Sequence, residues 1–99
     1  MKDYSNRELA QYYYSLLCMT TTATRLTQFQ RNRETITNFE NQISKYFEEY
    51  GNLKDLRIKG IGDKSKSLLE LILDRGYEEA LRIKVNSPDV YSWIKYNFK

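Results

Sequence analysis

Apolar residues recur every three or four positions along most of this 99-residue chain, which is the spacing of a helix with one buried face. No glycine or proline interrupts residues 1–50, and this favours long helices in the first half. Ser5 and Glu8 have the spacing of a capping box. The first helix is therefore expected to begin at this pair and to end near Met19.

A second helical region is predicted to begin near residues 22–23, after three consecutive threonines that disfavour helix. Its apolar spacing continues to Tyr50, and Gly51 then has the position of a C-terminal cap. The pattern allows either one helix or two, with residues 31–33 as the candidate bend.

Residues 53–75 carry two further apolar periodic stretches joined by Gly60-Ile61-Gly62, the pattern of a helix-hairpin-helix. Gly76 is expected to end the second of these helices. Residues 77–98 are predicted to form two short helices. The last one is expected to start at Asn86-Ser87-Pro88, a polar N-cap followed by a first-turn proline.

Together these elements predict one all-α domain over residues 1–99, a compact bundle of five or six helices that contains one helix-hairpin-helix. Cys18 has apolar neighbours and is interpreted as a small buried hydrophobe. With a single cysteine and no histidine, neither an internal disulfide nor a zinc site is expected. The predicted core includes Leu9, Leu16, Phe39, Ile43, Leu56, Ile58, Leu69, Ile72 and Trp93.

The chain contains no apolar run of about 18–20 residues and no apolar stretch near its start. Neither a membrane-spanning helix nor a signal peptide is therefore expected. A cytoplasmic or nucleoid-associated location is the corresponding prediction.

Positive charge is concentrated around the glycine turn. The net charge is +3, and residues 1–50 contribute nothing to it because their six basic and six acidic side chains cancel. Residues 54–66 carry a net charge of +3 by themselves. This bias is typical of a nucleic-acid-binding surface, although a merely solvated surface would show it too. The basic residues of the segment are Lys54, Arg57, Lys59, Lys64 and Lys66.

The glycine turn has the composition of a phosphate-binding site. Because Gly60 and Gly62 lack a Cβ, a phosphate can approach their backbone N–H groups closely. The helix that starts near Asp63 directs its positive end to the same place, and an external anion would relieve Lys64 and Lys66 in its first turn. The alternative is an ordinary structural turn in which Asp63 is the N-cap and offsets the lysines.

These residues resemble the amino-terminal domain of family X DNA polymerases, particularly the terminal-transferase branch. Residues 58–62 resemble the first hairpin of that family, and residues 62–67 resemble the start of its second helix. Residues 6–10 are similar to the opening helix of the family, and residues 86–98 to the segment that leads to its second hairpin. Residues 20–50 align poorly, so no residue role is carried across them.

The resemblance implies a domain that binds gapped or nicked DNA and holds a backbone phosphate with hairpin amides. It also implies a monovalent cation, Na⁺ or K⁺, held by the main-chain carbonyls of Leu56, Ile58 and Ile61. Some members are deoxyribose-phosphate lyases that use a Schiff-base lysine. That position is Leu68 here, and leucine cannot form an imine. The five aspartates include no closely spaced pair for two-metal polymerase chemistry.

The sequence therefore predicts a non-enzymatic DNA-binding protein that contacts the phosphate backbone with little sequence preference. Gapped, nicked and single-stranded DNA are the candidate partners, and no cofactor other than the monovalent cation is expected. The residues predicted to bind DNA phosphate are Lys59, Gly60, Ile61, Gly62, Asp63, Lys64 and Lys66.

Two alternatives remain open at this point. One is a helical protein-interaction module that recognises a protein partner through Tyr12-Tyr13-Tyr14, because three consecutive tyrosines cannot all face one core. The other is a residual deoxyribose-phosphate lyase or end-processing enzyme.

Overall fold

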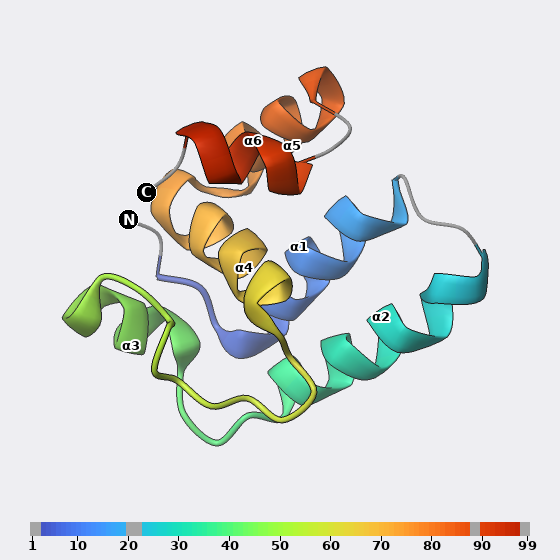
Figure 1. The fold of residues 1–99 in the computed structure, drawn as a ribbon. Helices are drawn as coiled ribbons and strands as arrows, with labels where there is room; N and C mark the ends of the chain where they lie inside the picture. The colour runs from blue at the N-terminus through green and yellow to red at the C-terminus, as the bar shows by residue number, and fades with distance from the viewer. Residues whose placement is uncertain (1–2, 20–22, 88–89, 98–99) are drawn as a thin grey trace.

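The computed structural model describes residues 3–19, 23–87 and 90–97, and it folds them into six helices without a strand (Figure 1). This confirms the prediction of an all-α bundle of five or six helices. None of the described helices is long and apolar enough to cross a lipid bilayer. The helices are α1 (Asn6–Cys18), α2 (Ala23–Thr37), α3 (Ile43–Tyr50), α4 (Asp63–Arg75), α5 (Tyr77–Asn86) and α6 (Val90–Asn97).

Helix α4 lies in the middle of the bundle, with α1 along one side and α5 and α6 across another (Figure 1). It also contacts α3. A helix that is apolar on more than one face must be surrounded by other elements, and α4 meets this condition. Its fully buried side chains are Leu68, Leu69, Leu71, Ile72 and Leu73.

The predicted start of α1 is confirmed. The Glu8 N–H donates to the Ser5 hydroxyl at 3.1 Å, and the Ser5 N–H donates to the Glu8 carboxylate at 3.0 Å. These two bonds satisfy N–H groups that a helix start would otherwise leave without partners. The C-terminal cap predicted at Gly51 is also confirmed, since this glycine adopts the left-handed backbone with φ +77°.

The second helical region consists of two helices, and the break lies at residues 38–42 rather than at the predicted bend, residues 31–33, which continue within α2. Asn6 at the start of α1 holds this break. Its side-chain amide donates to the carbonyls of Phe39 and Asn41 at 3.1 and 2.7 Å, and its oxygen accepts the Ile43 N–H at 2.9 Å. These bonds stabilise an interruption that local apolar spacing does not encode.

The first helix predicted for the hairpin, within residues 53–59, does not form. The Leu53 N–H donates to the carboxylate of Glu70 on α4 at 2.6 Å, and the Lys54 N–H donates to the side-chain oxygen of Asn52 at 3.0 Å. A helix of seven residues has little stability of its own, so these side-chain acceptors are enough to hold the segment in turns. The structure thus contains the glycine turn and the helix after it, but not the helix before it.

The two short helices predicted within residues 77–98 are α5 and α6, but the boundary between them differs from the prediction. Asn86 is the last residue of α5 and not an N-cap for α6, because the helical hydrogen bonds extend to a 2.8 Å bond between the Ser87 N–H and the Ile83 carbonyl. Pro88, the predicted first-turn proline of the last helix, lies outside the described residues.

Most of the predicted core is buried. Phe39 and Trp93 are only half-buried and pack against the core from its edge, and Cys18 is half-buried rather than enclosed. The predicted core residues that are buried are Leu9, Leu16, Ile43, Leu56, Ile58, Leu69 and Ile72.

A polar network crosses the core and holds the first turn of α4. The Tyr13 hydroxyl of α1 shares a 2.8 Å hydrogen bond with the Ser65 hydroxyl of α4 and accepts one from the Asn32 amide of α2 at 2.9 Å. The Asn32 oxygen in turn accepts from Gln28 at 2.9 Å. Tyr13 and Asn32 are buried, so each polar atom depends on these partners.

We predict that Tyr13→Phe lowers the free energy of unfolding by about 1–3 kcal/mol, because it leaves the buried Asn32 amide without its acceptor. Tyr14→Phe is the matched control, since the Tyr14 hydroxyl makes a 3.5 Å contact with Gln30 at an exposed position. That change should stay within about 0.5 kcal/mol. Urea denaturation of both variants measures the difference, and equal stabilities would contradict a structural role for the network.

The stability difference between wild type and Tyr13→Phe should also depend on pH. Burial raises the pKa of Tyr13 above its ordinary value, and its hydrogen bonds with Ser65 and Asn32 oppose this shift less strongly. Above about pH 10 the unfolded chain therefore loses this proton more readily than the folded one, so the free energy of unfolding falls as the pH rises. The stability gap between wild type and Tyr13→Phe should narrow in that range.

Candidate nucleic-acid interface

The turn at residues 58–62 presents its glycines to solvent because its isoleucines are buried on the other side. The Ile61 N–H donates to the Ile58 carbonyl at 3.0 Å and closes the turn. Ile58 and Ile61 are buried, whereas Gly60 and Gly62 are exposed. Gly60 has φ +82°, in the left-handed region that side chains with a Cβ rarely adopt. The predicted turn is therefore present, anchored by apolar side chains.

The two glycines have different backbone requirements. Gly62 lies at φ −90° and ψ −174°, an extended conformation open to any residue, so Gly60 is the position that needs glycine. A Cβ built at either glycine would meet no atom within 4 Å. The space in front of both residues is therefore open to a ligand.

The start of α4 lacks a side-chain cap. Gly62 is the N-cap of α4, and Asp63 is its first helical residue. The alternative in which Asp63 is the N-cap is therefore wrong. The first helical bond runs from the Lys66 N–H to the Gly62 carbonyl at 3.0 Å. An α-helix offers no intrahelical acceptor to the N–H groups that precede its first helical bond, and this general arrangement favours anions at helix starts.

Basic side chains surround this helix start. Lys54, Arg57, Lys59 and Lys64 are exposed, and so is the acidic Asp63. Lys66 is half-buried, and its Nζ lies 3.4 Å from the Lys54 carbonyl, so its ammonium group folds back onto the preceding loop. The structure thus brings the predicted phosphate-binding residues together at one end of α4. Lys66 differs from the other lysines of this set because its ammonium group lies against the protein backbone.

The structure also describes the residues to which the family resemblance assigns a lyase or cation-binding position. Leu68 is fully buried in the core, so the position of the family's Schiff-base lysine has neither an amine nor access to solvent. The Ile58 carbonyl already accepts the Ile61 N–H, which leaves it one lone pair for the predicted monovalent cation. Oxygen atoms are suitable ligands for a hard cation. The monovalent cation at the carbonyls of Leu56, Ile58 and Ile61 stays a prediction.

Three polar residues that position the turn have no signal in the sequence. Glu70 holds the loop before the turn through the Leu53 N–H, and Tyr13 and Asn32 hold the helix after it through Ser65. These contacts span 17 to 52 residues of chain, whereas helical periodicity and capping operate within about four residues.

Comparisons of this chain with known protein families, with curated proteins and with solved structures find no match. What the glycine turn binds is therefore inferred from its own residues and their geometry.

The two glycines give a matched pair of stability predictions. Gly60→Ala should lower the free energy of unfolding by about 1–2 kcal/mol, because alanine is strained in the left-handed region. Gly62→Ala should change it by less than about 0.5 kcal/mol, because its backbone is extended and its Cβ would enter open space. Urea denaturation distinguishes the two, and equal effects would contradict the backbone geometry of the turn.

Proposed function

We propose that this protein is a non-enzymatic DNA-binding protein that contacts the phosphate backbone through the glycine turn and the start of α4. The observation that carries the proposal is the uncapped helix start behind two exposed glycines with open space in front of them. A phosphate oxygen is a suitable acceptor for backbone N–H groups in this arrangement. The likeness to the amino-terminal domain of family X DNA polymerases is part of the same proposal.

The distribution of charge supports DNA as the ligand. Residues 54–66 carry a net charge of +3, and four of their five basic side chains are exposed. Amide and lysine contacts reach phosphates and not base edges, so binding should depend little on sequence and strongly on salt. A monovalent cation at the turn carbonyls would add positive charge beside the same phosphate.

A lyase activity is the less favoured alternative. Imine formation requires an amine in the active position, and the buried Leu68 provides none. Lys64 and Lys66 are the nearest amines in the sequence, but the Lys66 ammonium group lies against the Lys54 carbonyl.

We predict that Lys64→Ala weakens binding by a similar factor for single-stranded, duplex and gapped DNA. It should also make the slope of log affinity against log salt shallower by about one unit, because one fewer counterion is released. Fluorescence anisotropy at several salt concentrations measures both quantities. Lys95→Ala on α6 removes the same charge away from the turn, and it should leave the slope unchanged. Equal slopes in the two variants would place the contact elsewhere.

Gly62→Val tests the backbone contact in the same assay. Valine tolerates an extended backbone, and its Cβ would meet no protein atom, so the circular dichroism spectrum should be preserved. Its branched side chain would occupy the space in front of the N–H groups, so binding should fall further than in Lys64→Ala. Undiminished affinity in the folded variant would reject phosphate binding by the turn.

We further predict that borohydride traps no covalent adduct between this protein and DNA with an abasic or deoxyribose-phosphate end, because Leu68 cannot form an imine. Gel electrophoresis of the reduced mixture detects an adduct. An adduct that disappears in Lys64→Ala or Lys66→Ala would show that one of these lysines is a nucleophile.

A further inference from the structure

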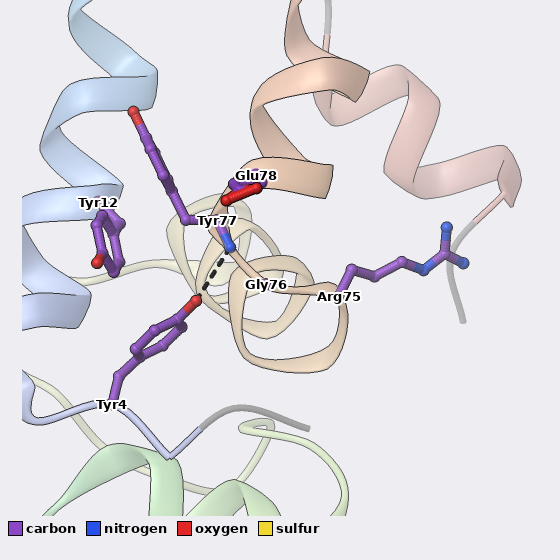
Figure 2. Close-up of a pocket in the computed structure, with 6 residues that line it drawn as sticks. All are labelled: Tyr4, Tyr12, Arg75, Gly76, Tyr77 and Glu78. Atoms are coloured by element: carbon purple, nitrogen blue, oxygen red, sulfur yellow. Dashed lines mark hydrogen bonds between the residues drawn. The ribbon is translucent and has the colours of Figure 1, made fainter.

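Three tyrosines cluster around a hollow between α1 and the start of α5, at the opposite end of α4 from the glycine turn (Figure 2). The rings of Tyr12 and Tyr77 stack with centroids 4.4 Å apart, and Tyr4 meets Tyr12 edge-on at 5.0 Å. The Tyr4 hydroxyl accepts the Tyr77 N–H at 3.1 Å. The hollow has a volume of about 280 Å³, and its three rings are half-buried, so part of their surface is open to a ligand.

Two charged residues line this hollow, Glu78 and Arg75. Glu78 lines it and makes no ion pair within the part of the chain that the structure describes. Arg75 also lines it, but its side chain points away from the tyrosines in Figure 2. The Arg75 guanidinium lies 5.5 Å from the centre of the Trp93 ring and 3.6 Å from the Asp74 carboxylate. A carboxylate is thus the charged group beside the rings.

The start of α5 does not favour an anion here. Its first N–H is already bonded to the Tyr4 hydroxyl, and Glu78 and Glu79 in the first turn offset the positive end of the helix. Stacking covers one face of Tyr12 and one of Tyr77. The ring faces that remain uncovered are negative, and together with a carboxylate they attract an organic cation. The chemistry of the hollow therefore matches a positively charged ligand.

We propose that the hollow formed by Tyr4, Tyr12, Tyr77 and Glu78 binds an ammonium group. The site is independent of DNA binding, because it shares no residue with the glycine turn. Its surface continues on both sides. A neighbouring hollow shares Tyr12 and is lined by Arg7, Glu8 and Gln11, and another shares Glu78 and is lined by Glu79 and Arg82. A chain that carries the ammonium group, such as a peptide with a lysine, has room along this surface.

Choline and its uncharged carbon isostere dimethylbutanol test the proposal. The two have nearly the same shape, so a difference in affinity reports the charge. In an NMR titration of the tyrosine ring signals, choline should bind at least about fivefold more tightly than the isostere. Equal binding, or no shift of the Tyr4, Tyr12 and Tyr77 signals with choline, would overturn the proposal.

Matched variants locate the site. Glu78→Gln should weaken choline binding about threefold or more, whereas Glu79→Gln, the same change at the next residue, should not. Tyr12→Leu should remove most of the preference for choline over dimethylbutanol, and Tyr14→Leu should keep this preference. Glu78 is exposed, so Glu78→Gln should fold like the wild type. The proposal can therefore still be tested if Tyr12→Leu does not fold. Equal effects of the two glutamate changes would overturn the proposal.

The same titration distinguishes an ammonium group on a protein partner from one on a small free ligand. A five-residue peptide with a central lysine, and the same peptide with trimethyllysine, are compared with choline. Tighter binding of either peptide than of choline indicates a protein partner that also occupies the neighbouring hollows. Binding of choline alone indicates a small free ammonium ligand, and both outcomes support an ammonium site.

Discussion

The start of α4 is tied to α1 by the hydrogen bond between the hydroxyls of Ser65 and Tyr13. The buried leucines of α4 provide apolar contacts that are not directional, and this hydrogen bond adds a directional one. The Tyr13 hydroxyl also accepts from Asn32, so one buried oxygen links α1, α2 and α4. This link keeps Ser65 turned inward and its neighbour Lys64 exposed.

A second polar contact shapes the approach to the turn. Because the Glu70 carboxylate binds the Leu53 N–H, the chain enters the turn from a loop and not from a helix. Leu56, Ile58 and Ile61 are nevertheless buried, and they hold the loop against the core. The glycines therefore stand outward on a supported backbone, which is the arrangement that a rigid anion-binding turn requires.

The two proposed surfaces lie at opposite ends of α4. Gly62 precedes the helix and Gly76 follows it, and thirteen helical residues separate the ends by about 20 Å. The first surface has exposed basic side chains and two exposed glycines, whereas the second combines aromatic rings with a carboxylate. The ligands proposed for the two surfaces have opposite charges, so a change at one surface can be measured without disturbing the other.

The sequence by itself determined the all-α class, the capping box at Ser5, the cap at Gly51 and the isoleucine-anchored glycine turn. These features depend on periodicity and capping among residues a few positions apart, and such local physics can be read directly. Only the tertiary structure decided the break at residues 38–42, the loop at residues 53–59 and the tyrosine hollow. Each of these depends on a side chain such as Asn6, Glu70 or Tyr4 reaching a group 17 to 73 residues away, and that contact exists only after the chain has folded.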